Sequence, residues 1–352
     1  MTPAETWKHL FDRSQSSKDP EERALAEDIS KQDALFTPSK KHSSEEILRL
    51  LRENEPDTIT IVAIGPLTNL AIAAFQDPET MLRAHEIVVM GGNINDIGNV
   101  GPSSATSTTT NIPEPPFRLI KQPDTPLRTR LNTRNQITPV AEFNTFADSI
   151  AAARLYALSS PTPESTMPPI FPGTTTALGP YPSSLSKQLK ITLFPVDITH
   201  RHNLSRGVYR STMSQTPTTN PSPLATWISA FLSSTFTKIE SLQENASGDA
   251  VDLGLHDPLT IWYCMTDPSE WKLAVDQDIR IETSGQWTRG MCVVDRRTRR
   301  KRDEGDEGER PGDTGNWLSR KGGNRLRYAV KSPEGGEEGF GGLMLRRILG
   351  LE

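Results

Sequence analysis

Polar side chains occur in three segments at which a predicted strand passes into a helix. These segments are 63–69 (Ala-Ile-Gly-Pro-Leu-Thr-Asn), 138–144 (Thr-Pro-Val-Ala-Glu-Phe-Asn) and 255–259 (Leu-His-Asp-Pro-Leu). Their carboxylate, amide and imidazole groups can bind polar ligands, and carboxylates and imidazoles can also transfer protons. The three segments are therefore the candidates for a functional site.

Each candidate side chain also has a plain structural interpretation. Asp257 stands directly before Pro258, the pattern of an ordinary helix N-cap. Glu142 and Asn144 could simply be solvated. A single histidine such as His256 is more often packed or exposed than catalytic.

The elements that must position these segments alternate between strands and helices. Helical spacing over 44–54 is followed by a β-branched run at 58–64, an Ala- and Leu-rich helix at 67–75 and a strand at 86–90. This β-α-β pattern predicts a parallel sheet with its ligand site at the carboxyl ends of the strands. Further along, the sequence predicts a buried strand at 191–196, a long helix at 224–243, a helix at 258–265, and a hairpin that joins 273–283 to 289–294.

The composition argues against several classes of protein. The 352 residues carry 39 Lys and Arg against 44 Asp and Glu, a formal net charge of −5, which is unlike a dedicated nucleic-acid binder. Two cysteines cannot build a disulfide scaffold and favour a reduced intracellular compartment. No apolar run approaches the ~20 residues of a membrane span, and residues 1–7 lack the features of a signal peptide. We expect a cytoplasmic protein that binds neither nucleic acid nor membranes.

Three stretches lack the periodicity of regular structure. Residues 100–134 and 160–186 are rich in Ser, Thr and Pro, and we expect irregular insertions there. Residues 298–352 are predicted to form a low-complexity, mostly disordered C-terminal region, so that the folded domain spans 1–297. The basic cluster at 296–302 is the one feature that favours nucleic-acid binding, but the acidic residues that follow it cancel its field.

Taken together and in this order, the motifs resemble the inosine-uridine-preferring nucleoside hydrolase family, in particular its fungal members. The residues that carry the resemblance lie at 62–69, 87–92, 138–144, 255–259, 288–290 and 293–297. The match spans roughly 43–99, 136–158, 188–210 and 250–297. The resemblance implies an α/β fold, an open and mostly parallel sheet flanked by helices.

The resemblance also implies an activity and roles for individual residues. The family hydrolyses the N-glycosidic bond of purine or pyrimidine ribonucleosides, a salvage reaction, by attack of a water that a bound Ca²⁺ activates. By motif, Asp257 and the backbone carbonyl of Ile64 would be calcium ligands, Glu142 and Asn144 would hold the ribose hydroxyls, and His256 would assist departure of the base. Family members also form homo-oligomers, which makes a homo-oligomer possible here.

The family's acidic motif, Asp-x-Asp-x-x-x-Asp-Asp, has no counterpart in this sequence, which contains no adjacent Asp-Asp pair. That motif lies in the family's first β-α-β unit, so we expect this unit to be missing and the chain to be truncated at its amino end. The family's Gly-Asn pair before the Ala-Glu-Phe-Asn segment is displaced as well. Gln136 stands at the offset of the asparagine, and a Gly98-Asn99 pair lies far upstream, so neither Asn99 nor Asn135 is assigned as a ribose contact.

Two functional interpretations follow. The first is a nucleoside hydrolase homologue whose isolated chain is inactive or nearly so, because too few oxygens would surround the calcium ion. The second is a non-catalytic α/β protein, a pseudoenzyme that retains the ribose pocket as a binding surface.

Overall fold

The computed structural model describes residues 39–95, 139–169, 178–217, 222–242, 247–297, 299–302 and 310–351. It divides into two compact units. One combines Ser43–Arg201 with His256–Glu334, and the other combines Met1–His42, His202–Leu255 and Gly335–Glu352. Asn99, Asn135 and Gln136 lie outside the described residues, as does the whole of the segment 100–134.

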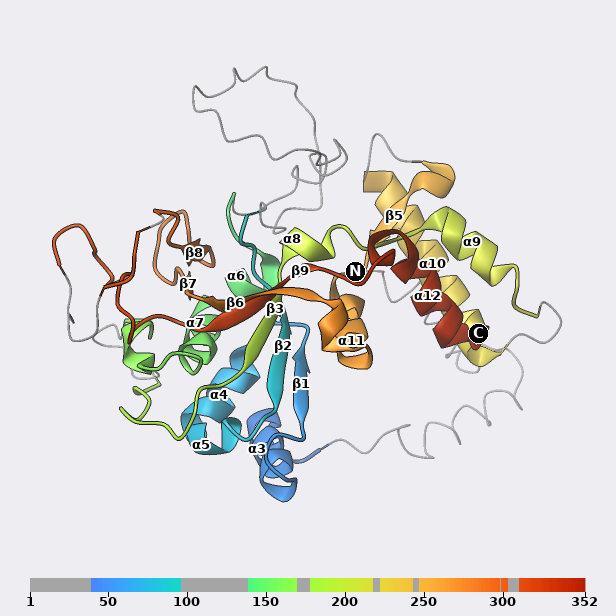
Figure 1. Cartoon of the computed structure of the whole chain (residues 1–352). Coiled ribbons are helices and arrows are strands. Elements are labelled where there is room, and N and C mark those ends of the chain that lie inside the picture. The colour runs from blue at the N-terminus through green and yellow to red at the C-terminus, as the bar shows by residue number, and fades with distance from the viewer. Residues whose placement is uncertain are drawn as a thin grey trace, which may run out of the picture. The chain divides into compact units, whose positions relative to one another are not determined.

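The larger unit is built on a mostly parallel sheet (Figure 1), which among the described residues has five strands in the order β1-β2-β3-β9-β6. β1, β2, β3 and β9 run parallel, and β6 is antiparallel to β9. The strands are β1 (Thr60–Ala63), β2 (Glu86–Met90), β3 (Ile191–Phe194), β6 (Lys272–Gln277) and β9 (Leu326–Lys331). The α/β fold class predicted from the sequence is thus confirmed.

Helices cover both faces of this sheet, and the alternation of side chains along β2 and β3 shows which helix lies where. Ile87, Val89, Ile191 and Leu193 belong to the main apolar core. That core also contains side chains from α3 (Ser43–Glu53), α4 (Thr68–Gln76), α5 (Pro78–Met81) and α7 (Ser149–Ala157). Phe194 directly follows Leu193 in β3, so its side chain points to the opposite face. Its ring contacts the ring of Tyr263 in α11 (His256–Met265) at a centroid distance of 5.2 Å. Since successive strand side chains point to opposite faces, α11 covers the second face.

Short elements complete the larger unit. The helices α6 (Phe143–Ala147) and α8 (Val196–Thr199) follow the second motif segment and β3, respectively. β7 (Ile279–Ile281) pairs with β8 (Cys292–Val294) as an antiparallel hairpin. The predicted hairpin is therefore confirmed in its inner part, whereas residues 272–277 instead join the main sheet as β6.

The smaller unit is mainly helical. It contains α9 (Arg206–Met213), α10 (Pro223–Leu242) and α12 (Gly336–Leu349), with a short antiparallel pair of β4 (Asn203–Ser205) and β5 (Asp252–Gly254). Gly341 lets α12 approach β4, because a Cβ atom there would lie 2.5 Å from the carbonyl oxygen of Asn203. None of the described helices is long and apolar enough to cross a membrane.

The prediction of a mostly disordered region over 298–352 is wrong for its described part. Leu326 and Ala329 are buried where β9 lies between β3 and β6, and α12 belongs to the smaller unit. The surrounding Gly, Arg and Glu residues dominated the composition of this region and concealed the alternating Leu-Arg-Tyr-Ala-Val-Lys segment. A single domain over 1–297 is likewise not the division that the contacts give.

The basic cluster at 296–302 is also more structured than its composition predicts. Arg296 donates to the side chain of Asn95 at 3.0 Å, Arg297 pairs with Asp295 at 2.8 Å, and Arg302 pairs with Asp313 at 2.5 Å. These arginines hold loops of the larger unit together, which explains part of the cluster without any nucleic acid.

The irregular segment 160–186 is also packed against the core, at least in part. Its residues 170–177 lie outside the described residues. Arg154 of α7 donates to the carbonyls of Leu178 and Gly179 at 3.0 and 2.7 Å, and its guanidinium lies over the ring of buried Tyr181. This contact fixes the described end of the segment against the core.

Candidate functional site

The candidate residues gather at the carboxyl ends of the parallel strands. Ile64 directly follows β1, the loop Gly91–Asn95 follows β2, and α8 follows β3. In register, Ala63 pairs with Val89 and Met90 pairs with Phe194, so these ends lie side by side. Ligands of open α/β sheets bind at this edge.

The carboxylate of Glu142 is fully engaged by the protein itself. Only 1% of the residue is exposed, and its two oxygens accept hydrogen bonds from the backbone N–H of Gly92 (2.9 Å), Asn144 (2.7 Å) and Thr145 (2.9 Å), and from the Thr145 hydroxyl (3.0 Å). Burial raises the pKa of Glu142, and the hydrogen bonds partly oppose this shift. Glu142 thus caps α6 and fastens it to the loop after β2.

Gly92 shows why this loop needs glycine. Its φ of +79° lies in the left-handed region, and a Cβ atom would lie 2.8 Å from Sγ of Cys292 in β8. The close approach brings the backbone N–H of Gly92 to the carboxylate of Glu142.

Asn144 presents an amide oxygen toward the same edge. Its Nδ2 donates to the carbonyl of Met90, the last residue of β2, at 3.0 Å. Within the described residues, Oδ1 accepts no hydrogen bond, so an acceptor of fixed orientation remains available to a ligand hydroxyl. This geometry is compatible with the ribose contact expected from the sequence, which stays a prediction.

His256 stands in the first turn of α11, partly buried, with Nδ1 2.7 Å from Oγ1 of Thr199 in α8. The ring of His200 lies against it at a centroid distance of 5.3 Å. Burial, followed by repulsion from His200, lowers the pKa of His256 to about 4. His256 is therefore neutral near pH 7, and the tautomer in which Nδ1 accepts from Thr199 carries its hydrogen on Nε2.

Asp257 follows directly and differs from Glu142 in having an open carboxylate. In the described part of the chain this carboxylate accepts no hydrogen bond and forms no ion pair, and burial raises its pKa. Its backbone carbonyl accepts from Thr260 at 2.6 Å. Since α11 begins at His256, Asp257 lies inside the first turn, and the interpretation as a side-chain N-cap has no support here.

The direction of α11 places this pair of residues at the correct edge. Tyr263, two turns further along α11, lies 3.4 Å from Glu86 at the amino end of β2, whereas His256 contacts α8 beyond the carboxyl end of β3. Consequently α11 runs antiparallel to the strands and begins where they end.

Whether these residues can bind a metal ion depends on how many oxygen ligands they offer. Ca²⁺ takes about six to eight oxygen ligands. Asp257 offers an unengaged carboxylate, and Ile64 contributes backbone at the same edge. Within the described ranges, however, no three His, Cys, Asp or Glu side chains gather closely enough to hold a metal ion. The described residues do not by themselves fit a complete calcium site.

Comparison with known proteins decides the family. A model of the family described as inosine-uridine preferring nucleoside hydrolase matches residues 10–311. The chain belongs to this family. Over 268 residues it is 29% identical to an uncharacterized protein of Schizosaccharomyces pombe, a match that covers 74% of this chain and 60% of that protein. Over 258 residues it is 24% identical to the inosine-uridine preferring nucleoside hydrolase of Leishmania major, covering 72% of this chain and 56% of the other.

Solved structures of nucleoside hydrolases share the fold. A plant nucleoside hydrolase superposes with a TM-score of 0.55 at 18% identity, covering 90% of this chain and 69% of that chain. The purine-preferring ribonucleoside hydrolase of Gardnerella vaginalis gives 0.54 at 16% identity, covering 91% and 69%. The chain thus spans about 60% of the length of the S. pombe relative and 56% of that of the L. major enzyme.

Two residues at the site were not singled out from the sequence. Thr199 orients His256, and the carboxylate of Asp197 accepts from the backbone N–H of Ile94 (2.7 Å) and Asn95 (2.6 Å), which fixes the loop after β2. Both belong to Asp-Ile-Thr-His, directly after the predicted strand at 191–196. Their position at the carboxyl end of a predicted parallel strand was the available signal.

Proposed function

We propose that this chain carries the ribose- and base-facing part of a ribonucleoside hydrolase site, whose reaction is hydrolysis of the N-glycosidic bond. The observation that carries the proposal is a set of three polar groups at one edge of the sheet that have no partner among the described residues. They are the amide oxygen of Asn144, Nε2 of His256 and the carboxylate of Asp257. Buried or half-buried polar groups normally have partners, so a ligand with several hydroxyl groups is a suitable occupant.

Each of the three groups has a distinct task in this proposal. The Asn144 oxygen accepts a hydrogen bond from a ribose hydroxyl. Neutral His256 donates from Nε2 to the heterocyclic base and stabilises the negative charge that develops on it as the bond breaks. Asp257 and the carbonyl of Ile64 would supply two of the roughly six to eight oxygen ligands of a Ca²⁺ ion, too few to hold it by themselves. The curated relative from L. major is named for inosine and uridine, and these are the substrates to test first.

In this proposal Glu142 positions Asn144 and does not contact the ligand itself. Its engaged carboxylate favours a positioning role over direct contact with ribose, because four protein donors already occupy its oxygens. By capping α6 it fixes the backbone of Asn144 and thereby the direction of the Asn144 amide.

We further propose that turnover by this polypeptide alone is very low. The sequence contains no Asp-Asp pair, and general-base catalysis contributes about 10²–10⁴ in rate. A second candidate, a ribose-binding protein without turnover, is favoured by the same shortage of carboxylates and by the complete engagement of Glu142.

The proposal is tested in two steps on the purified chain. Ligand-observed NMR measures binding of inosine and uridine, with Asn144→Ala and Asp257→Asn as site variants. Asp249→Asn, an exposed carboxylate paired with Arg210 in the smaller unit, is the matched control. Weaker binding in both site variants and unchanged binding in the control supports the site, and equal binding in all four proteins contradicts it.

The second step measures release of reducing sugar with added Ca²⁺ and with chelator. Calcium-dependent turnover that Asp257→Asn abolishes identifies an active hydrolase and excludes the binding-only candidate. Nucleoside binding without sugar release favours that candidate and agrees with low turnover.

A further inference from the structure

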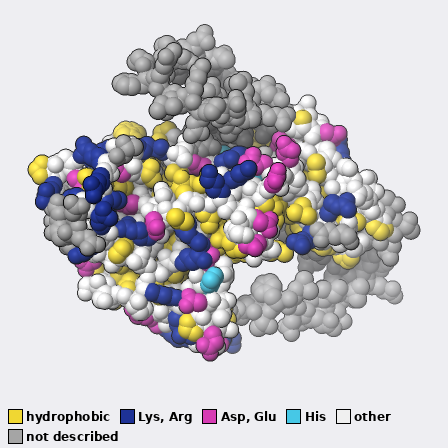
Figure 2. Space-filling view, in the orientation of Figure 1, with side chains coloured by type: hydrophobic (Ala, Val, Ile, Leu, Met, Phe, Trp, Pro, Cys, Tyr) yellow, Lys and Arg dark blue, Asp and Glu magenta, His cyan; other side chains and the backbone are white. Residues whose placement is uncertain are grey.

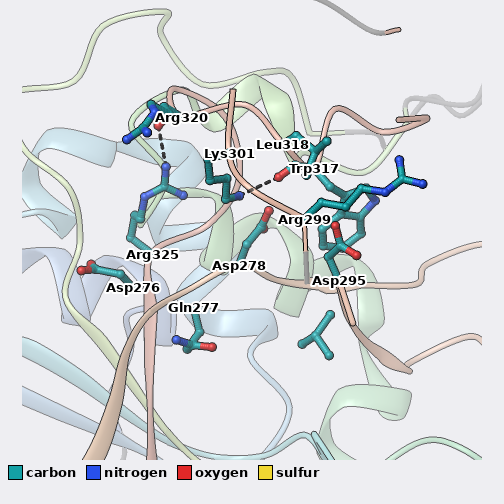
Figure 3. A pocket seen from close by; sticks show the side chains of 11 residues that line it. Asp276, Gln277, Asp278, Asp295, Arg299, Lys301, Trp317, Leu318, Arg320 and Arg325 are labelled. Carbon is teal, nitrogen blue, oxygen red and sulfur yellow. Dashed lines mark hydrogen bonds between the residues drawn. The ribbon is translucent and has the colours of Figure 1, made fainter. Parts of the chain in front are cut away.

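A second pocket, unrelated to the carboxyl edge of the sheet, lies in the larger unit. It has a volume of about 450 Å³ and opens between the end of β6, the end of β8, residues 299–301 and residues 317–325 (Figure 3). Gln277, which lines it, pairs with Leu326 at the amino end of β9. The part of the pocket that Gln277 lines is thus at the amino end of β9, whereas the candidate nucleoside site lies at the carboxyl ends of the parallel strands.

Four cationic side chains line this pocket: Arg299, Lys301, Arg320 and Arg325. Three carboxylates line it as well, but Asp278 is paired with Arg280 at 2.8 Å and Asp295 with Arg297 at 2.8 Å. Asp276 is the third. The arginines that neutralise Asp278 and Asp295 are not among the lining residues, so the pocket itself carries an excess of positive charge.

The four cations are held in place by backbone oxygens. Lys301 donates to the carbonyl of Trp317 at 2.6 Å, and Arg299 donates to Gly312 at 3.0 Å. Arg325 donates to Arg320 at 2.7 Å, and Arg320 to Arg302 at 2.6 Å. Within the described ranges none of the four forms an ion pair with a carboxylate.

Most of the hydrogen-bond donors of this cluster therefore remain open. An ammonium group has three N–H donors and a guanidinium five, and carbonyls engage only some of them. Lys301 is nearly half-buried, and its pKa is lowered, first by burial and then by the nearby charges of Arg325 and Arg280, against the attraction of Asp278 and Asp295. An anion beside Lys301 would relieve this repulsion.

Arginine forks and a lysine ammonium around a concave site are the donors that recognise phosphate. We propose that this pocket binds the phosphate group of a small phosphorylated molecule. The volume is within the range of small-molecule sites, about 300–1,000 Å³, and the concave shape and the net charge of −5 of the whole chain disfavour a nucleic-acid strand. Arg320 and Arg325, two of the four cations, lie beyond residues 10–311, the range that the family model matches, whereas Arg299 and Lys301 lie within it.

The test is calorimetric titration of the purified chain at constant ionic strength in a phosphate-free buffer. The probes are inorganic phosphate, a nucleoside monophosphate and a single-stranded oligonucleotide. Binding of inorganic phosphate with equal or tighter binding of the monophosphate supports the proposal, and the comparison of the two shows whether the ligand is free phosphate or a nucleotide. Binding of the oligonucleotide without binding of either small probe overturns it, as does no binding of any probe.

Variants assign the site. Lys301→Met is expected to weaken phosphate binding about tenfold, the effect of one charge-assisted hydrogen bond, whereas Lys301→Arg retains most of the affinity. Arg299→Ala provides an independent reduction in case Lys301→Met perturbs folding, which a thermal melt monitors. The matched control is Lys272→Met, which removes one positive charge from an exposed lysine at the start of β6, outside the pocket. An equal loss in Lys272→Met and Lys301→Met contradicts the site.

Discussion

Replacement of Glu142 by alanine is the perturbation whose effect the structure defines best. The substitution removes the acceptor of three backbone N–H groups, on Gly92, Asn144 and Thr145, and of one hydroxyl. Each buried donor left without a partner costs about 1–3 kcal/mol. Relaxation and the relief of burying a charge reduce the sum, so we expect a loss of about 3–5 kcal/mol in the free energy of unfolding.

Urea unfolding followed by circular dichroism measures this loss. The matched control is Asp267→Ala, an N-cap whose carboxylate also accepts a backbone N–H bond, from Ser269 at 2.9 Å, but is exposed. A single exposed cap contributes about 1 kcal/mol. If Glu142→Ala costs no more than Asp267→Ala, Glu142 does not fasten α6 to the loop after β2, and the case for a positioning role is lost.

Three other predictions concern residues of the larger unit. Gly92→Ala should cost at least about 1–2 kcal/mol through its positive φ and more through contact with Cys292, whereas Gly91→Ala, whose Cβ would meet its nearest neighbours at 3.5 Å, should be almost neutral in the same unfolding assay. His256 has a folded-state pKa of about 4 against 6.5 unfolded, so the stability it contributes is present above pH 6.5 and is lost as pH falls toward 4. Between pH 6.5 and pH 4 the free energy of unfolding of the wild type should fall by up to about 3 kcal/mol relative to that of His256→Gln. If the free energies of the two proteins change in parallel with pH, the lowered pKa of His256 is contradicted. Arg327→Met should destabilise the larger unit by about 1–3 kcal/mol, because buried Glu86 loses the guanidinium but keeps its ion pair with Lys190 at 3.3 Å. Arg52→Met, which breaks an exposed pair with Asp77, should cost under about 1 kcal/mol in the same measurement.

The central part of the fold could be predicted from sequence because its signals are local. The β-branched and apolar runs at 58–64, 86–90 and 191–196 correspond to β1, β2 and β3, and the helix between the first two makes them parallel. The burial of these strands agrees with the prediction only in part. β2 and β3 are fully buried, as the runs predict, whereas β1 is an edge strand of the described sheet and is half-exposed.

Non-local features were harder to predict. Nothing in the segment 326–331 alone says that it will lie between β3 and β6, since that position depends on pairing with strands far away in the chain. The state of each candidate side chain is also a tertiary property. Glu142 and Asp257 are both carboxylates near a helix start, yet only Glu142 is engaged. Asn144 and Thr145 in the first turn of α6 donate to Glu142, and the fourth donor, Gly92, lies 50 residues away in the chain. Asp257 lies inside the first turn of α11, and its carboxylate accepts no hydrogen bond from the described residues.

We propose that this chain brings an open carboxylate, Asp257, to a nucleoside site but has too few further carboxylates there to activate water. Calcium-dependent release of ribose from uridine or inosine by the purified chain tests it most directly. We predict sugar release at or near background, with no difference between the wild type and Asp257→Asn, although both remain folded. Robust turnover by the wild type that Asp257→Asn abolishes would contradict the claim.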